Sequence, residues 1–362
     1  MISLAVKYRP QVFADVVSQD SIKTILQNQI ESGDFKNAYL FCGGAGTGKT
    51  TTARIVAKEM NNGKGTPIEI DGASNNGVDN IREMIEKSKS KALDCKYKVF
   101  IIDEVHMLST GAFNALLKTL EEPPAGTIFI LCTTDPQKIP NTILSRVQRF
   151  DFKRIPTQQI VERHKYIIEC ENTEIIIENG GSQDAEHDIE WAIHEGIPVI
   201  EYEEEALEYI AKLADGGMRD SITMLDKVLG YSRDITLENV ITSLGGSDYN
   251  QYFALLHTIV DGNTVGALQL TTKAHTDGKD LKLYIRNFTN FILDVVKYSL
   301  TNDIAITALP SMYEPKLSNA SKCGQETLLN ILEYMNTLCQ EIKWETNPKP
   351  LIEAEMILLC QD

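Results

Sequence analysis

The sequence predicts an α/β fold at the start of the chain and an all-α fold after it. Residues 1–152 alternate apolar runs with amphipathic stretches, which is the pattern of a parallel sheet covered by helices. Residues 153–362 consist mostly of segments with helical spacing. A chain of 362 residues is also long for a single core. We therefore expect a parallel-sheet domain at 1–152, a small helical lid at 153–247 and a third, helical domain at 248–362.

Four strands and three groups of helices account for this division. The expected strands are apolar runs of strand length at residues 38–42, 66–70, 97–103 and 127–134. Between them, helical spacing marks residues 51–60, 78–92 and 111–122. The lid helices are expected at 157–169, 203–216, 218–230 and 236–246, and those of the third domain at 249–260, 279–300, 327–344 and 349–360.

The composition narrows the class of protein. Hydrophobic residues make up 43% of the chain, and no apolar run is long enough to span a bilayer. The first ten residues lack a basic start followed by an apolar stretch, so we expect a cytoplasmic protein without membrane contact. None of the seven cysteines belongs to a C-x-x-C pair, which favours reduced thiols over a disulfide framework or a zinc site.

The net charge of −16 is concentrated in one segment. Residues 169–208 contain 14 acidic side chains and no Lys or Arg, so the rest of the chain carries a net charge of only −2. Such a remainder can still present a basic face to nucleic acid. Residues 171–200 within the acidic segment interrupt the helical pattern of the lid. We expect them to form an extra surface hairpin or loop that lies away from DNA.

A glycine-rich loop points to phosphate binding. The stretch GGAGTGKT, residues 43–50, matches G-x-x-x-x-G-K-[ST] between an expected strand and an expected helix. Glycines let backbone N–H groups approach phosphates, and the helix N-terminus favours negative charge. The Lys can reach the β- and γ-phosphates, and the last Thr hydroxyl can ligate Mg²⁺. We expect nucleotide contacts from Gly44, Ala45, Gly46, Thr47, Gly48, Lys49, Thr50 and Thr51.

Two adjacent acids supply the partner of this loop. Asp103 and Glu104 follow the apolar run at 97–102, at the carboxyl end of an expected strand, where ligands of parallel sheets bind. Taken alone, such a pair is often only a solvated strand end. Together with the loop, it indicates a nucleoside triphosphate hydrolase core. Asp103 is expected to hold the Mg²⁺ shell, and Glu104 to polarise the attacking water.

Two further positions are candidates for contact with the nucleotide, and each also has an alternative interpretation without that contact. Thr133 or Thr134 ends the next strand and can contact the γ-phosphate or the water, although a strand-end hydroxyl without that role fits the spacing equally well. Arg219 opens a lid helix, where the helix dipole disfavours a cation. It either folds over bound nucleotide or pairs with Asp220 at the surface.

Six segments together carry a resemblance to one known family. They are YRPQVFADVVSQD, FCGGAGTGKTTTARIVAKEMN, IEIDGASNNGVDNIREMIE, YKVFIIDEVHMLSTGAFNALLKTLEEPP, TTDPQKIPNTILSRVQRFDF and GGMRDSITMLD. In these segments the chain resembles the gamma/tau subunits of the bacterial DNA polymerase III clamp loader. The resemblance covers residues 1–247 and continues more weakly beyond them. It implies an AAA+ fold that binds ATP and Mg²⁺ at a subunit boundary. It also implies a five-subunit assembly that opens a ring-shaped sliding clamp and places it on primer-template DNA.

The resemblance also assigns roles to particular residues. It implies that Arg146, in the Ser-Arg pair at 145–146, is an arginine finger that reaches a neighbouring subunit's ATP. Val147 replaces the Cys that is usual there, which leaves the charge unchanged. Thr133 matches the family's sensor on the strand, and Arg219 matches the sensor on the lid. The segment that packs around adenine and ribose contributes Tyr8, Arg9, Pro10 and Val17.

Contacts with DNA are implied in the same way. Arg82, Ser109, Thr110 and Lys118 match positions that face duplex phosphates, which carry no sequence information. For Arg82 and Lys118, ordinary helix-surface charge is the alternative.

Three features depart from the family pattern. Residues 59–70, EMNNGKGTPIEI, cross the gap where family members usually carry a four-cysteine zinc module, so we expect no zinc. The acidic stretch near 171–200 is an addition. The sequence ends at Asp362 without the long extension of the tau form, so we expect a short version, with a cellular and a phage origin both open.

Two rival functions are weighed against a clamp-loader motor. One is another AAA+ remodelling ATPase of the helicase or branch-migration type, which generally acts as a closed hexamer. The Ser-Arg context and the lid segment ADGGMRDS fit that type less well. The other is a non-hydrolysing assembly subunit of the loader. Such a subunit is expected to have a broken phosphate loop, and this loop is intact.

Overall fold

The computed structural model describes residues 2–90, 95–181, 185–244 and 249–361, and the chain divides into two compact units. The first unit comprises Met1–Ile200 and Ile210–Lys227, and the second Glu201–Tyr209 and Val228–Asp362. The expected three-domain division stays a prediction, and its boundary at 247/248 lies outside the described residues.

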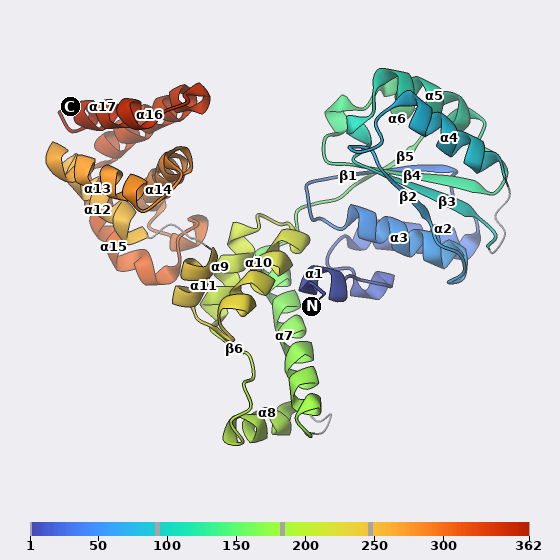
Figure 1. The fold of residues 1–362 in the computed structure, drawn as a ribbon, viewed down its shortest axis with the longest axis horizontal. Helices are drawn as coiled ribbons and strands as arrows, with labels where there is room; N and C mark the ends of the chain where they lie inside the picture. The colour runs from blue at the N-terminus through green and yellow to red at the C-terminus, as the bar shows by residue number, and fades with distance from the viewer. Residues whose placement is uncertain (1, 91–94, 182–184, 245–248, 362) are drawn as a thin grey trace. The chain divides into compact units, whose positions relative to one another are not determined.

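A five-stranded parallel sheet forms the centre of the first unit (Figure 1). Its order is β2-β3-β4-β1-β5, and its strands are β1 (Ala38–Cys42), β2 (Ile68–Asp71), β3 (Lys98–Asp103), β4 (Thr127–Thr133) and β5 (Gln148–Asp151). The four expected strands are confirmed, and so is the α/β fold class. The sequence does not predict β5, because this short edge strand buries only Phe150.

Helices cover both faces of the sheet (Figure 1). On one face lie α2 (Asp20–Ser32) and α3 (Lys49–Met60), and on the other α4 (Val78–Lys89), α5 (Thr110–Glu121) and α6 (Asn141–Leu144). Successive residues of a strand point to opposite faces. Phe41 accordingly packs into the core on the α3 side, and Leu40 into the core on the α5 side. Burial on both faces explains why β1, β3 and β4 are nearly continuous apolar runs.

The first unit also contains the start of the lid. Here lie the short α1 (Leu4–Lys7), the long α7 (Thr157–Glu178) and α8 (Ala185–His194). Two further helices, α9 (Glu204–Leu213) and α10 (Met218–Tyr231), follow. The helices expected at 157–169, 203–216 and 218–230 are therefore confirmed.

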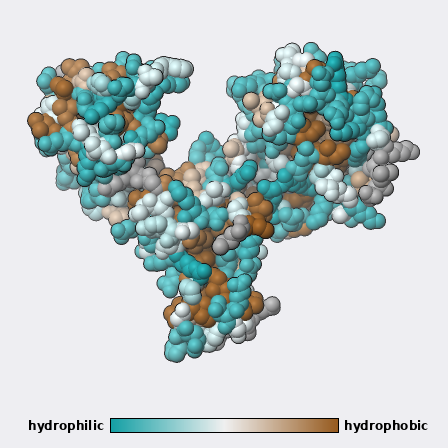
Figure 2. Space-filling model, viewed as in Figure 1, coloured by the Kyte–Doolittle hydropathy of each residue, from teal (hydrophilic) through white to brown (hydrophobic). Residues whose placement is uncertain are grey.

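The acidic stretch at 171–200 differs from the expected hairpin or loop at its beginning, because α7 continues through Glu178 before α8 follows. Residues 173–199, here called the acidic arm, form a small core of their own from Ile176, Ala192 and Val199. Figure 2 shows hydrophobic side chains gathered over this end of α7 and α8. The Asn172 side chain closes the base of the arm: its Nδ2 donates to the Ile200 carbonyl at 2.9 Å, and its Oδ1 accepts from the Ile200 N–H at 2.7 Å.

The second unit is almost entirely helical, as expected. A two-stranded pairing of β6 (Glu201–Tyr202) with β7 (Asp234–Ile235) precedes α11 (Leu237–Leu244), α12 (Tyr249–Val260), α13 (Thr264–Thr276), α14 (Leu281–Thr301), α15 (Glu314–Ala320), α16 (Gln325–Glu341) and α17 (Lys349–Leu359). The sequence does not predict α13, whose Thr and Gly residues have weak helix propensity. Within the described part of the chain, no helix has the length and apolar character needed to cross a membrane.

Candidate nucleotide site

The site lies where the parallel strands end. Strand register places Asp71 of β2 opposite Asp103 of β3, and Thr133 of β4 opposite Cys42 of β1. The glycine-rich loop begins directly after Cys42, so it starts at the edge where the two carboxylates collect. This is the edge at which ligands of parallel sheets bind.

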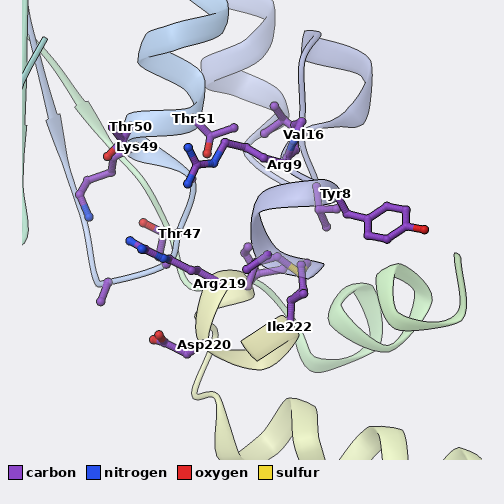
Figure 3. Close-up of a pocket in the computed structure, with 18 of the residues that line it drawn as sticks. Tyr8, Arg9, Val16, Thr47, Lys49, Thr50, Thr51, Arg219, Asp220 and Ile222 are labelled. Carbon is purple, nitrogen blue, oxygen red and sulfur yellow. The ribbon is translucent and has the colours of Figure 1, made fainter. Parts of the chain in front are cut away.

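A pocket of about 390 Å³ opens beside this edge (Figure 3). It is lined by residues from the loop, the amino-terminal segment, the end of β3 and the start of α10. Of the residues predicted from the sequence, those that line it are Tyr8, Arg9, Pro10, Val17, Ala45, Gly46, Thr47, Gly48, Lys49, Thr50, Thr51, Asp103, Glu104 and Arg219. These residues are gathered in one cavity, whereas Gly44, Thr133 and Arg146 are not part of its lining.

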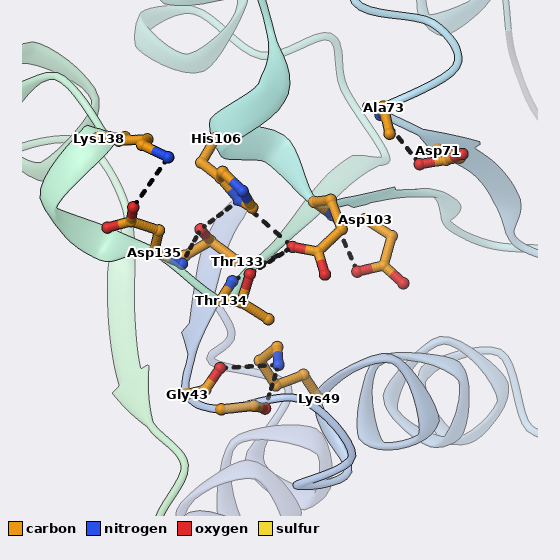
Figure 4. A network of polar contacts seen from close by, with 12 residues as sticks. Gly43, Lys49, Asp71, Ala73, Asp103, His106, Thr133, Thr134, Asp135 and Lys138 are labelled. Carbon is orange, nitrogen blue, oxygen red and sulfur yellow. Dashed lines mark hydrogen bonds and ion pairs between the residues drawn. The ribbon is translucent and has the colours of Figure 1, made fainter. Parts of the chain in front are cut away.

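Lys49 is a buried cation held over the loop. Its side chain is 6% exposed, and Nζ donates to the carbonyl oxygens of Gly43 at 2.9 Å and Gly44 at 2.7 Å (Figure 4). Burial lowers the pKa of Lys49, and the nearby carboxylates of Asp103 and Glu104 oppose that shift only in part. An anion bound in the loop stabilises such a desolvated ammonium, so this arrangement fits a phosphate group.

Thr50 and Asp103 form the donor set that fits Mg²⁺. The Thr50 hydroxyl donates to Asp103 Oδ2 at 2.8 Å, which joins the first turn of α3 to the end of β3. A hydroxyl and a carboxylate at a loop of this type are oxygen ligands of the kind that Mg²⁺ takes, together with phosphate oxygens and water. Among the described residues, no group of three or more His, Cys, Asp or Glu side chains could hold a metal ion. The expected absence of zinc stays a prediction.

Glu104 is held by the end of β4. Its Oε2 accepts from the Thr134 hydroxyl at 2.9 Å and from the Thr134 N–H at 3.3 Å, and it lies 3.3 Å from His106 Nδ1 (Figure 4). The Glu104 backbone is left-handed, with φ 45° and ψ 46°. Residues other than glycine rarely adopt this backbone conformation, and backbone strain of this kind is often found at functional sites.

The structure places the two candidate threonines differently. Thr134 lines the pocket and contacts Glu104. Thr133 is fully buried; its hydroxyl accepts from the Asp135 N–H at 3.0 Å and lies 3.2 Å from His106 Nδ1. Of the two threonines that the sequence left as candidates, Thr134 lines the pocket, whereas Thr133, which matches the family's sensor, does not.

The lid helix begins directly over the loop. The Met218 N–H donates to the Gly46 carbonyl at 3.0 Å, and Arg219 lines the pocket at the start of α10. Gly46 has φ +68°, and a Cβ there would lie 3.0 Å from the Gly217 Cα. The glycine thus permits the contact between loop and lid. Arg219 and Asp220 both line the pocket, and the two interpretations of Arg219 stay predictions.

The amino-terminal segment forms another wall of the pocket. Figure 3 shows the Tyr8 ring pointing away from Lys49 and Thr50. The Tyr8 hydroxyl instead donates to Glu171 Oε1 at 2.7 Å, and its backbone carbonyl accepts from the Arg163 guanidinium at 2.8 Å. Tyr8 therefore forms part of the pocket wall while its ring points away from the glycine-rich loop.

Arg146 does not line this chain's own pocket. Its Nε donates to Glu121 Oε1 at 2.8 Å, and another guanidinium nitrogen donates to the Thr142 carbonyl at 2.6 Å. The side chain is 33% exposed. Arg146 is thus held at the surface beside the end of α5, apart from the lining of the pocket.

The residues predicted to contact DNA lie on α4 and α5, which cover the same face of the sheet. Ser109 caps α5, its hydroxyl accepting from the Ala112 N–H at 3.2 Å, and Thr110 is the first residue of that helix. Lys118 is exposed in the last turn of α5. On α4, Arg82 is 67% exposed and pairs with Asp79 at 3.2 Å.

Several pocket residues were not singled out from the sequence. Arg54 lies one turn after Thr50 on α3, a spacing that could have identified it, and its guanidinium pairs with Glu69 at 2.6 Å. Arg163 projects from α7, where no motif marks it. Apolar lining from Val16, Ile155 and Ile222 comes from three distant segments, and only the folded chain shows that they converge.

Three family models match successive parts of the chain. Residues 68–156 match "DNA polymerase III, delta subunit", and residues 198–234 match "DNA polymerase III clamp loader subunit, ATPase lid domain". Residues 235–360 match "DNA polymerase III subunits gamma and tau domain III". The resemblance noted in the sequence is thus found independently in three segments.

Whole-chain comparison decides the family. The DNA polymerase III subunit gamma of Buchnera aphidicola subsp. Baizongia pistaciae is 30% identical, over 98% of this chain and 95% of that protein. The chain belongs to the DNA polymerase III gamma/tau family. The subunit tau of Bacillus subtilis is 37% identical over 98% of this chain, which spans only 62% of that relative's length.

One solved structure is also similar to this gamma/tau family member. It is the Thermotoga maritima RuvB Holliday junction branch migration motor, with a TM-score of 0.49 and 19% identity over 76% of this chain and 86% of that one.

Proposed function

We propose that the chain is the ATP-hydrolysing motor of a clamp loader, which places a sliding clamp on primer-template DNA. The observation that carries this proposal is the convergence of Lys49, Thr50, Asp103 and Glu104 on one pocket, in a chain of the gamma/tau family. An intact set of these groups distinguishes a hydrolysing subunit from one that only holds the assembly together. We place this activity in the cytoplasm, where bacterial DNA is replicated.

Each side chain then has a defined task. Lys49 neutralises the β- and γ-phosphates of ATP, and Thr50 with Asp103 holds Mg²⁺. Bound Mg²⁺ supplies positive charge beside the phosphates. Glu104 orients and polarises the attacking water, and Thr134 fixes the Glu104 carboxylate through two hydrogen bonds. Arg219, at the start of the lid helix, closes over the nucleotide.

Arg146 acts on a neighbouring subunit's nucleotide. This follows from its position at the surface, away from its own pocket, and from the Ser-Arg motif of the family. A guanidinium placed there neutralises charge that develops in the transition state. The assembly that this requires is a pentamer of clamp-loader subunits.

DNA is held through its backbone. Exposed Arg82 and Lys118, with the capped start of α5 at Ser109 and Thr110, offer cations and N–H groups to phosphates without reading bases. This suits a machine that acts at any primer end.

The experiment that tests the proposal measures ATP hydrolysis by the full chain assembled with its partner subunits, alone and with primed DNA plus a sliding clamp. Hydrolysis should rise when DNA and clamp are added. Glu104→Gln should still bind ATP but lose about 100-fold or more in turnover, because only the group acting on water is changed. Lys49→Ala should lose nucleotide binding itself. Normal turnover by Glu104→Gln would remove that carboxylate from catalysis.

A further inference from the structure

Helix α7 contacts the nucleotide pocket from the outside. Near its middle, Arg163 lines the pocket and donates to the backbone carbonyl of Tyr8 at 2.8 Å. Two turns later, Glu171 Oε1 accepts from the Tyr8 hydroxyl at 2.7 Å. The single residue Tyr8 is thus held at both its backbone and its side chain by the same helix.

The residue before Tyr8 is held there as well. Lys7 Nζ lies 2.7 Å from Glu171 Oε1 and also pairs with Glu174. Hydrogen bonds to these two carboxylates raise the pKa of Lys7 in spite of the opposing effect of burial. Glu171 is 22% exposed and Lys7 32%, so the pair is partly withdrawn from solvent and its charges are less screened than those of a surface pair.

These contacts set the position of one wall of the pocket. Arg9 and Pro10, which line the pocket, follow Tyr8 directly in the chain, so a shift of Tyr8 moves them too. The loop that carries Lys49 is held separately, by β1 and α3. The two parts of the pocket therefore depend on different supports.

We propose that Glu171 and Arg163 are positioning residues for the nucleoside end of the pocket, and that the phosphate end does not depend on them. They act through Tyr8 on the segment that runs to Val17. This rests on the proposed function in so far as the ligand is a nucleotide. It also assigns a function to Glu171 at the start of the acidic segment, which the sequence identifies only as an addition to the family pattern.

The test separates the two ends of the ligand. The full chain is titrated with ADP and, separately, with inorganic pyrophosphate, which occupies only the phosphate end. Glu171→Ala should weaken ADP binding by about 3- to 10-fold, as expected for the loss of one or two hydrogen bonds, and leave pyrophosphate affinity unchanged. In the assembled ATPase the same variant should raise KM and keep kcat, because the catalytic groups are untouched.

Three further variants sharpen the result. Glu178→Ala is the matched control, an exposed Glu near the end of the same helix. Glu171→Gln keeps an oxygen for the Tyr8 hydroxyl and should recover part of the ADP affinity. Tyr8→Phe combined with Glu171→Ala should be little worse than Glu171→Ala alone, since both remove the same hydrogen bond.

Two outcomes overturn the inference. One is an ADP affinity of Glu171→Ala equal to that of Glu178→Ala. The other is an equal loss of ADP and pyrophosphate binding together with a lower melting temperature, which assigns Glu171 to the general stability of the fold. A parent chain that binds neither ligand instead overturns the proposed function, and this inference with it.

Discussion

At the scale of single residues, Lys49, Thr50 and Asp103 meet at the glycine-rich loop, whereas Arg163 and Glu171 contact Tyr8 from α7. Lys49 and Thr50 occupy fixed places in a motif, and Asp103 ends an unmistakable buried strand. Arg163 and Glu171 carry no motif, because their contacts join positions more than 150 residues apart in the chain. Long-range contacts of this kind leave no local pattern in the sequence.

The two threonines at the end of β4 give a test at this scale. Thr134→Val removes the hydroxyl that donates to Glu104, so turnover should fall about tenfold while the melting temperature stays near that of the parent. Thr133→Val removes the acceptor of the Asp135 N–H and should lower the melting temperature. Steady-state ATPase assays and thermal unfolding of both variants check this. The opposite assignment, with turnover lost only in Thr133→Val, restores Thr133 as the sensor.

At the scale of elements, burial decided what could be predicted. The strands β1, β3 and β4, which are buried on both faces, are predicted from the sequence, and β5, with one buried residue, is not. The short β2 is predicted as well, from Ile68 and Ile70, although these two side chains are only partly buried. Helix α7 was recognised only to residue 169, because beyond it the sequence is strongly acidic and loses the amphipathic pattern of a lid helix. Its continuation is stabilised by tertiary contacts with Lys7, Tyr8 and Ile200.

The pair α7 and α10 contains a histidine that makes stability depend on pH. His164 is fully buried, its Nε2 lies 2.7 Å from the Ser221 hydroxyl, and its Nδ1 finds no hydrogen-bond partner among the residues that the structure describes. Burial lowers the pKa of His164 to about 4.

Because this pKa lies below that of the unfolded chain, the unfolded state binds the proton more readily between the two values. Stability should therefore fall as the pH drops from about 6.5 to about 4, by up to about 3 kcal/mol from this group. Urea unfolding of the parent and of His164→Gln across this range measures it. A pH dependence that is identical in the two proteins would contradict the assignment.

The acidic arm provides a second test at the element scale. Its base is closed by Asn172 and Ile200, so residues 175–198 can be replaced by a short Gly-Ser turn that keeps Glu171 and Glu174. Since none of the described residues within 175–198 lines the pocket, DNA-stimulated ATP hydrolysis should be largely retained. A cut that also removes Glu171 and Glu174 should weaken ADP binding. Loss of folding or of DNA stimulation in the first variant would show that the arm is needed for one or the other.

At the scale of the whole molecule, the sequence shows where the negative charge is concentrated but not what the acidic segment does. Most of the net charge of −16 comes from residues 169–208, and a near-neutral remainder is compatible with DNA binding. The family models match both the lid segment and the last helical part of the chain. Because we propose that Arg146 acts on the nucleotide of a neighbouring subunit, its role has to be tested in the assembled oligomer.

Mixing two inactive variants distinguishes action on a neighbour from action on the same chain. Arg146→Ala should bind ATP nearly as well as the parent but lose hydrolysis by about 10³- to 10⁵-fold, as for other arginine fingers. Glu104→Gln keeps its Arg146. In mixed assemblies some interfaces combine an intact Arg146 with an intact Glu104, so activity should return. No recovery in an oligomer verified to contain both variants would mean that Arg146 serves its own chain.

The contact between Gly46 and the lid helix also bears on how this sequence can evolve. Every substitution that replaces a glycine introduces a Cβ, and at this position a Cβ would lie 3.0 Å from the Gly217 Cα on a backbone with φ +68°. Synonymous codon changes are neutral here, but we expect every amino-acid replacement to strain the contact between loop and lid. An exposed position such as Glu178 can vary freely, whereas a residue other than glycine at position 46 requires the lid to move.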